Sequence, residues 1–587
     1  MWNAFRRKPR TWRGRDTRRS NTGPSARASI GALRRNPLGR PLLVLTDPRT
    51  IAWLGPEIVL IAAATGIVVA GAFLRGSAFA TMRIIAAVSI LAAGAALRVG
   101  EANHWMTTET GEWTGPLVCD PLGFLVRHLA LFAGLLLTLM LSRGADERDG
   151  TETLGLILFL TVGAMIAARA NELVLVFLGL ELVSIPTYAL LYLGRNDRDG
   201  SEASAKYFFL SILSSAFFLY GASFLYGIAG TTWITAPEGI ASIRDAVSRD
   251  PQPFAMLGLA LVVAGLGFKL AAVPFHFYAP DVYQGTNHRN AAILAVMPKV
   301  AGLAVLIRLV VMGLPGVRNE VWQLALVLSV LTMTVGNVCA LWQTDLRRMM
   351  AYSSIAHAGY LLIGIAVGAA AVGDPLPYGG VAASVYYLCV YSVATIGLFA
   401  ALQSLGDGSR RVDSLDHVAG LGVTDPWKAA ALAVFLFSLA GIPPLAGFWG
   451  KLTLFTTAIG QALRGESSMT PWFLGLALIA VANATIAAAY YLRVVGYLYF
   501  RTPPATSADL PSQSGPAGGL AAFLAAFLAA FLVLAIGLHQ GPLAEWADRG
   551  ERGLRALEPP PAAAVRATGP QHADIADRRG SLREPPE

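Results

Sequence analysis

The sequence predicts an all-α protein that crosses a membrane many times. Hydrophobic residues make up 55% of the 587-residue chain, and charged residues make up only 14%. Apolar runs of about 20 residues, the length that spans a bilayer as a helix, recur from residue 51 to residue 540. No stretch between them has the composition of a soluble catalytic domain. We therefore expect a polytopic membrane protein whose functional groups lie inside the bilayer.

The net charge of +9 comes largely from residues 1–40, which hold twelve Arg or Lys and one acid, Asp16. Because the remainder is apolar, this basicity does not predict nucleic-acid binding. We expect residues 1–50 to be a basic extension that is disordered or that results from a mis-called start codon. A structured or partner-binding extension and a targeting segment are the alternatives, and the absence of a long apolar stretch before residue 51 speaks against a simple signal peptide.

A window of about 19 residues finds about fourteen apolar spans. Arg and Lys are more frequent in alternate loops, which predicts that the first span starts outside and the last one ends outside. The tail is rich in Pro, Ala, Arg and Glu and is predicted to be polar and disordered. The expected regions are 51–143 (helices 1–3), 144–315 (helices 4–8), 316–500 (helices 9–13), 501–540 (helix 14) and the tail 541–587.

Two spans carry a lysine close to prolines. Span seven contains Lys269 and Pro274, and span twelve contains Pro443, Pro444 and Lys451. Proline removes a backbone donor and clashes with the carbonyl four residues before it, so helices 7 and 12 are expected to break. The two spans are five apart in order and run in opposite directions. This placement predicts two inverted five-helix repeats, spans 4–8 and 9–13, as in transporters with broken helices.

Isolated ionisable residues lie inside apolar spans. Lys269 is the only charged residue of 255–275, Lys299 is the only one of 291–307, and Glu181 is the carboxylate counterpart. A lysine near a bilayer centre costs roughly 2.5–3.5 kcal/mol on insertion scales, so we expect partners on other helices. Burial disfavours the ammonium form of a lysine, which can then exchange its proton near neutral pH. We predict proton-carrying roles for these residues and Lys451. The alternatives are snorkelling for Lys269 and Lys299, a loop position for Lys451, and a hydrogen-bonded core acid for Glu181.

Four further residues extend the candidate path. Glu202 and Lys206 share one helix face at the start of span six. In one reading, Glu202 and Lys206 form a local ion pair at the membrane edge. In the other, Lys206 lies close to Glu181 of the neighbouring span and keeps that carboxylate ionised. His276 and His357 are predicted relays between the lysines, because imidazole both donates and accepts a hydrogen bond, although core histidines satisfied by hydrogen bonds are the alternative.

The sequence lacks the motifs of a cofactor site. It has no phosphate loop, no dinucleotide-binding fingerprint, no iron–sulfur cysteine set and no haem-ligand histidine pair. Cys119, Cys339 and Cys389 lie far apart, without the spacing of a metal site or a disulfide framework. We therefore expect this chain to bind no cofactor and no metal.

Three strings resemble the antiporter-like membrane subunits of respiratory complex I, the proton-pumping NADH:quinone oxidoreductase: GFKLAAVPFHFYAPDVYQG, DLRRMMAYSSIAHAGYLL and SLAGIPPLAGFWGKLTLF. The likeness covers residues 50–540, and PDVYQG together with Lys451 favours the N branch of that family over the L and M branches. The string TNHRNAAIL, with His288 and Arg289, departs from the family pattern. The resemblance implies that Glu181 pairs with Lys206 beside Glu202, and that Lys269, Lys299, Lys451, His276 and His357 form the proton path.

The resemblance also implies a function. The chain would be a membrane-arm subunit in the inner membrane of a bacterium. It would couple electron transfer from NADH to quinone to proton translocation through buried Lys, Glu and His side chains, without redox chemistry of its own. NADH, FMN, iron–sulfur clusters and quinone would bind to the other membrane and hydrophilic subunits, which are its partners. The alternatives are a cation/proton antiporter subunit of a multi-subunit complex, or a structural scaffold.

Overall fold

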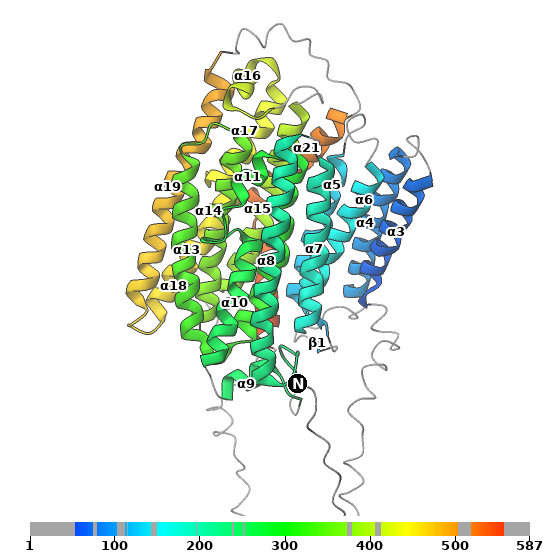
Figure 1. The fold of residues 1–587 in the computed structure, drawn as a ribbon. Coiled ribbons are helices and arrows are strands. Elements are labelled where there is room, and N and C mark those ends of the chain that lie inside the picture. The colour runs from blue at the N-terminus through cyan, green and yellow to red at the C-terminus, as the bar shows by residue number, and fades with distance from the viewer. Residues whose placement is uncertain are drawn as a thin grey trace, which may run out of the picture. The chain divides into compact units, whose positions relative to one another are not determined.

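Long apolar helices packed side by side make up nearly all of the described structure (Figure 1). The chain divides into two units, Met1–Ile51 and Ala52–Glu587. The extension expected at residues 1–50 lies outside the described residues, so every described element belongs to the second unit. The computed structural model describes residues 53–73, 79–102, 112–113, 116–141, 150–194, 197–236, 240–249, 253–371, 379–405, 412–502 and 518–556.

Within these residues, thirteen helices are long and apolar enough to cross a membrane, which confirms the predicted all-α, many-span fold class. Helix α12 continues into a π-helix, η1 (Ile307–Met312), and the 3-10 helix η2 (Pro315–Val317) precedes α13. The thirteen helices are α3 (Gly55–Phe73), α4 (Phe79–Ala102), α5 (Pro121–Leu139), α6 (Gly150–Ala167), α7 (Leu173–Gly194), α8 (Arg198–Ala229), α10 (Pro253–Leu270), α12 (His288–Leu306), α13 (Arg318–Ala340), α14 (Leu346–Ala370), α15 (Gly380–Leu405), α19 (Thr470–Phe500) and α21 (Gly518–Leu538).

The predicted count of about fourteen differs from the structure at span twelve. This region consists of two shorter helices, α17 (Pro426–Ala440) and α18 (Ala446–Arg464), instead of one long helix. Pro443 and Pro444 lie between them, and Gly441 ends α17 with a φ of 90°, a conformation that favours glycine. The predicted break is therefore present, while the inverted relation of the two repeats stays a prediction.

Span seven breaks as predicted too. Helix α10 ends at Leu270, and the short helix α11 (Ala279–Gln284) follows the proline-containing segment. Ala271 turns the chain with a φ of 56°. The hydroxyl of Tyr278 donates to the carbonyl of Phe268 at 3.0 Å, so one of the acceptors at the end of α10 finds a partner.

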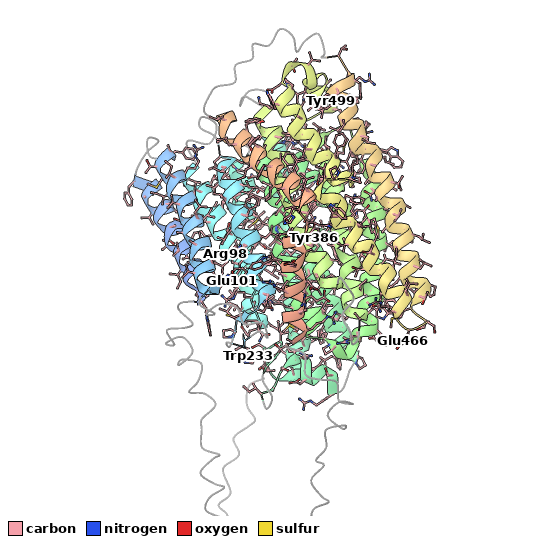
Figure 2. The ribbon with its side chains drawn as sticks, turned by 180° about the vertical axis from the view of Figure 1, so that it is seen from behind. Arg98, Glu101, Trp233, Tyr386, Glu466 and Tyr499 are labelled. Atoms are coloured by element: carbon pink, nitrogen blue, oxygen red, sulfur yellow. The ribbon has the colours of Figure 1, made fainter. Side chains whose placement is uncertain are left out.

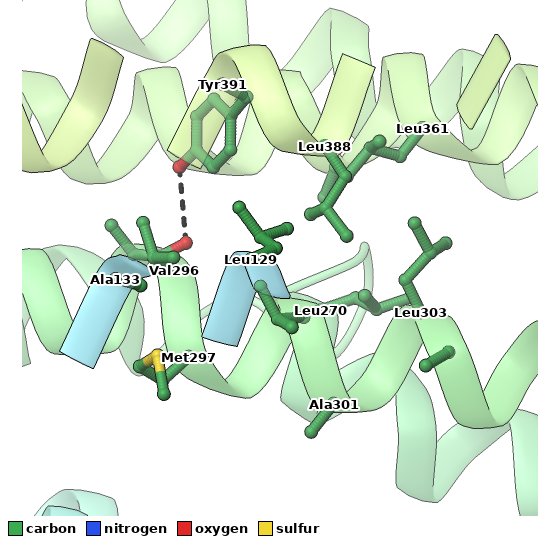
Figure 3. Close-up of a cluster of buried hydrophobic side chains, with 14 of the residues drawn as sticks. Leu129, Ala133, Leu270, Val296, Met297, Ala301, Leu303, Leu361, Leu388 and Tyr391 are labelled. Carbon is green, nitrogen blue, oxygen red and sulfur yellow. Dashed lines mark hydrogen bonds between the residues drawn. The ribbon is translucent and has the colours of Figure 1, made fainter. Parts of the chain in front are cut away.

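Three helices form the centre of the unit. The apolar windows of α12, α14 and α15 are completely buried, whereas only 28% of the α3 and α4 windows is buried, and Figure 1 shows α3 and α4 at one edge. Figure 3 shows Val296 of α12 and Leu388 of α15 in one apolar cluster with Leu129 of α5. In the same cluster, the hydroxyl of Tyr391 donates to the carbonyl of Ala295 at 3.4 Å and so joins α15 to α12.

The connections contain little further regular structure. Strands β1 (Glu112–Trp113) and β2 (Val118–Cys119) pair in antiparallel fashion. The short helices are α9 (Ile243–Arg249), η3 (Leu415–Val418) and α16 (Leu421–Thr424).

The prediction of a disordered tail from residue 541 is wrong for its first part. Residues Gly541–Ala556 form helix α22, which packs against α5 and α15. Its buried face contains Glu551, whose carboxylate accepts from the backbone N–H of Ala382 at 2.8 Å and pairs with Arg555 at 2.7 Å. Leu554 is buried on the same face, and Leu543 and Trp546 pack against the core, so the helix combines an apolar stripe with one partnered acid. Residues 557–587 lie outside the described residues.

A buried group of charges fixes the start of α5. Asp120 caps this helix by accepting from the N–H of Gly123 at 2.9 Å, and it pairs with Arg308 of η1 at 2.6 Å. A side chain at Gly123 would collide with Asp120 and Arg308, so the close approach requires glycine. Nearby, Arg127 pairs with Glu57 of α3 at 2.7 Å. The sequence analysis did not anticipate these pairs, although each joins elements far apart in the chain.

Replacing Arg308 with methionine should destabilise the protein strongly. The change leaves the carboxylate of Asp120, whose side chain is 0% exposed, without its cationic partner. Breaking a buried pair in this way costs about 3–5 kcal/mol. We expect a lower thermal unfolding midpoint in detergent and less assembled protein. Adding Asp120→Ala should recover part of the loss, because it removes the uncompensated charge.

The matched control is Arg464→Met, at the exposed end of α18, which should leave the midpoint unchanged. Equal midpoints for Arg308→Met and Arg464→Met would contradict a structural role for the buried pair.

Candidate functional site

Lys269 lies in the last turn of α10 and is held by two hydroxyl groups. Its ammonium nitrogen donates to the Oγ of Ser184 on α7 at 2.8 Å and to the Oγ of Ser211 on α8 at 3.1 Å. The side chain is buried, with 4% exposure, so the snorkelling alternative does not describe it. Lys269 thus finds its partners on two neighbouring helices, as the cost of burying a lone lysine requires.

Glu181 of α7 lies beside Lys269. Its carboxylate accepts a short hydrogen bond from the hydroxyl of Ser215 on α8. Glu181, Ser214, Ser215 and Lys269 line one small cavity of about 10 Å³, which is close to the volume that holds a single water molecule. The acid and the lysine therefore belong to one polar site between α7, α8 and α10.

Lys206 does not lie at this site, contrary to the implied pairing with Glu181. Its ammonium group bonds to Glu202 at 2.7 Å and to Asp281 of α11 at 2.8 Å. Lys206 and Ser215 are both on α8, nine positions apart. This offset corresponds to about two and a half turns of an α-helix, so the two side chains point in opposite directions. The local ion pair of Glu202 and Lys206, one of the two alternatives, is the one present.

Asp281 joins three helices at the start of α8. Besides Lys206, it accepts from Arg348 of α14 at 2.7 Å. Asp281 lies outside the thirteen spans, and partial burial opposes its charged form, but the hydrogen bonds from Lys206 and Arg348 outweigh burial and lower its pKa. The cluster lies near the first turns of α8, while Trp233, beyond the last turn of α8, lies at the far end of the bundle (Figure 2).

Lys299 lies in α12, completely enclosed by other helices. Its ammonium nitrogen donates to the Oγ of Ser354 on α14 at 2.8 Å and to the backbone carbonyl of the same residue at 2.9 Å. The Oγ of Ser354 also accepts from the hydroxyl of Tyr391 at 2.8 Å and lies 3.2 Å from the hydroxyl of Tyr283. Ser354 therefore connects the lysine to two tyrosines.

His357 lies one turn further along α14. Its Nδ1 is 2.5 Å from the hydroxyl of Tyr387, and its Nε2 is 2.9 Å from the hydroxyl of Tyr491. The hydroxyl of Tyr491 makes a further, short hydrogen bond with Ser353. The imidazole ring also contacts Tyr391, with ring centres 4.8 Å apart. His357 is thus a hydrogen-bonded core histidine, and its position between the Lys299 and Lys451 regions also suits a relay.

Lys451 is buried in the first turns of α18, which rules out the loop-lysine alternative. Its ammonium nitrogen donates to the carbonyls of Leu439 and Ala440 at 2.8 and 3.0 Å. These carbonyls belong to the last turn of α17 and are available because the helix breaks there. The nitrogen also lies 5.2 Å from the centre of the Tyr360 ring, and the centre of that ring is 5.9 Å from the centre of the His357 ring.

The structure does not link His276 directly to a lysine. This residue lies in the broken part of span seven and is partly buried. Its Nδ1 is buried and has no hydrogen-bond partner among the described residues. The predicted relay role of His276 stays a prediction.

Most of the hydroxyl groups that bind the charged residues were not predicted from the sequence. Ser184 follows Glu181 by three positions, so both lie on one helix face. Ser211, Ser214 and Ser215 interrupt an otherwise apolar part of α8. Polar residues at helical spacing inside a span were the available signal. Across the part of the chain with described structure, no three His, Cys, Asp or Glu side chains gather as they would to hold a metal ion.

The amines, imidazole and hydroxyls form two buried polar groups. One contains Glu181 and Lys269. The other contains Lys299, His357 and Lys451, with the Tyr360 ring between His357 and Lys451. Each of these groups can bind or release a proton or can relay one through a hydroxyl. The geometry suits the movement of protons between helices.

Comparison with known proteins agrees with this geometry. Residues 170–465 match the family described as NADH:quinone oxidoreductase/Mrp antiporter, TM. The chain is 36% identical to NADH-quinone oxidoreductase subunit N of Rhodospirillum rubrum, over 76% of this chain and 87% of that protein. It is also 36% identical to the same subunit of Herminiimonas arsenicoxydans, over 83% of this chain and 95% of that one.

Solved structures extend the comparison. A chain of respiratory complex I from Thermus thermophilus with bound aureothin matches with a TM-score of 0.66 and 30% identity, covering 84% of this chain and 98% of that chain. A chain of the Mrp complex from Dietzia matches with a TM-score of 0.69 at 21% identity, covering 89% of this chain and 99% of that chain, which shows a shared fold.

Proposed function

The chain belongs to the family of NADH-quinone oxidoreductase subunit N, and from this premise we propose that it translocates protons across the inner membrane of a bacterium through the buried residues Glu181, Lys269, Lys299, His357 and Lys451. Electrons pass from NADH to quinone in other subunits of the complex, where FMN and the iron–sulfur clusters are bound. This subunit supplies the proton path and no redox group.

One observation carries the proposal: three lysines are buried in the bundle without a carboxylate in direct contact. Lys269, Lys299 and Lys451 each bond to neutral hydroxyls or carbonyls. A charged lysine paired only with neutral groups in an apolar environment is costly, so its neutral form becomes accessible. Residues that serve only as structural support would be cheaper as apolar side chains.

Glu181 and Lys269 act as one unit in this proposal. A proton that arrives at Glu181 removes a nearby negative charge and so makes it easier for Lys269 to lose its own proton. Released protons then pass through the hydroxyls around Ser354 to the His357 and Lys451 region. Lys206 acts from the Asp281 cluster, by holding α8 against α11 and α14, and not by direct contact with Glu181.

The antiporter alternative is supported by the family that both kinds of protein share and by fold likeness to an Mrp chain that is 21% identical. Purification of the tagged chain from its native membrane, followed by mass spectrometry, separates the two. We expect the other membrane and hydrophilic subunits of an NADH:quinone oxidoreductase, together with NADH-driven proton uptake after reconstitution. Recovery of antiporter subunits only, without NADH oxidation, would overturn the proposed function.

A further inference from the structure

A cavity of about 440 Å³ lies among α4, α5, α15, α21 and α22. This volume falls within the roughly 300–1,000 Å³ of known small-molecule sites. Its wall is mostly apolar and includes Leu129, Phe132, Val393 and Leu532. Four of the five helices are candidate membrane spans, so the molecules that reach the cavity include those of the bilayer. The cavity is separate from the proton path described above.

Arg98 lies at the edge of the cavity, near the end of α4, next to Glu101 (Figure 2). Its guanidinium carbon is 5.5 Å from the centre of the Phe124 ring and 5.0 Å from that of Trp546. Among the described residues it makes one hydrogen bond, a long one of 3.3 Å to Glu101. A guanidinium held between aromatic rings in this way presents a planar set of donors that suits a phosphate group.

His128 provides a second polar group in the wall. Its Nδ1 lies 3.0 Å from the carbonyl oxygen of Phe124, which can only accept, so Nδ1 carries the hydrogen. In the neutral ring Nε2 is then an acceptor, and this atom is buried without a partner among the described residues. A ligand hydroxyl would satisfy it. The His128 ring lies 4.2 Å from the Phe124 ring, which also contacts Arg98, so both polar groups flank one aromatic side chain.

We propose that this cavity binds a glycerophospholipid with a hydroxyl-bearing headgroup. The phosphate bonds to Arg98, a headgroup hydroxyl donates to Nε2 of His128, and an acyl chain fills the apolar space beside Phe132 and Leu532. A quinone fits less well, because it offers carbonyl acceptors and no charge. Its carbonyls can accept from Arg98 without adding a negative charge, but they cannot donate to Nε2 of His128, which would stay unpaired.

The site borders a helix that also carries part of the proton path. Cys389 and Val393 of α15 line the cavity, while Tyr387 and Tyr391 of the same helix contact His357 and Ser354. A bound lipid would fill the space between α15 and the α5 and α21 helices and thereby hold α15 in place. Lipid binding itself does not depend on the proposed function.

Two photoactivatable lipids with the same diazirine-bearing acyl chain test the proposal. One is a phosphatidylglycerol and the other is a diacylglycerol, which lacks the phosphate. The purified complex is reconstituted in phosphatidylethanolamine vesicles with a trace of either probe, irradiated, digested and analysed by mass spectrometry. We expect the phosphatidylglycerol to label peptides containing Phe132, Cys389 or Leu532 roughly tenfold more than the diacylglycerol, the order expected for a charge-assisted hydrogen bond.

Variants define the polar and apolar parts of the site. Arg98→Ala should reduce phosphatidylglycerol labelling to the diacylglycerol level, and Ala535→Phe, which fills the cavity from α21, should reduce labelling by both probes. Arg501→Ala is the matched control, since Arg501 also lies over an aromatic ring, that of Tyr497 at 5.1 Å, but away from the cavity. It should change nothing.

Three results would overturn the proposal. The first is equal labelling by the two probes in the unmodified protein. The second is labelling no stronger in the cavity than around Leu478, an exposed residue of α19 that reports ordinary bilayer contact. The third is a result from solvent extraction of the purified complex. It would be the recovery of a quinone instead of a phospholipid, with the quinone lost only from the Arg98→Ala variant.

Discussion

Replacing Lys299 with methionine is expected to lower NADH-driven proton translocation by the assembled complex by at least about tenfold, a bound set below the roughly hundredfold that a positioned proton-transfer group typically contributes. Methionine has a similar length, so it fills the same space in α12. It cannot carry a proton, and it leaves Ser354 without its donor from α12. The measurement is acidification of reconstituted vesicles per electron transferred from NADH.

A matched control separates this effect from a general loss of stability. Lys428→Met is the same substitution at the start of α17, where Lys428 pairs locally with Asp425 at 2.8 Å. It should leave translocation unchanged. Lys299→Arg keeps the charge but cannot release the proton, so it should behave like the methionine variant. Normal proton translocation in Lys299→Met would remove this residue from the path.

Glu181→Gln is expected to have the second large effect, also of about tenfold or more on translocation. Glutamine keeps the shape of the side chain and can still accept from Ser215, so the helix contacts should survive. The change removes the charge beside Lys269, which then has no acid to exchange with in the small cavity. Electron transfer should fall with translocation if the two are tightly coupled.

Glu172→Gln serves as the control because it makes the same change just before the first turn of the same helix. There Glu172 accepts from the N–H of Leu175 at 3.1 Å, which glutamine can also do. We expect normal translocation. If both variants translocate protons like the unmodified complex, Glu181 is only a hydrogen-bonded core acid.

Sequence patterns predicted the membrane helices and both breaks well, because apolar runs and prolines act locally. Burial of Lys269 and Lys299 followed from the length of the surrounding apolar runs, whereas the prolines before Lys451 left a loop position open for that residue. The ion pair of Glu202 and Lys206 followed from a spacing of four residues on one helix. Each of these features depends on residues that are close together in the chain.

Features that depend on how helices rotate against each other could not be predicted. The order of the spans places Lys206 and Glu181 on consecutive helices, but the rotation of α8 directs Lys206 toward Asp281. Helix α22 was missed although Leu543, Trp546 and Leu554 recur at helical spacing on its packed side, because the overall polar composition of the tail was taken to indicate disorder. The pair of Asp120 and Arg308 joins residues 188 positions apart, which no local pattern reveals.

The break in span twelve gives Lys451 an unusual pair of ligands. Because the carbonyls of Leu439 and Ala440 belong to the main chain, any change in the charge of this amine acts directly on the backbone where α17 stops. Deprotonation would weaken the hydrogen bonds that Lys451 of α18 donates to the last turn of α17. The protonation state of this one amine therefore bears directly on the contact between α17 and α18.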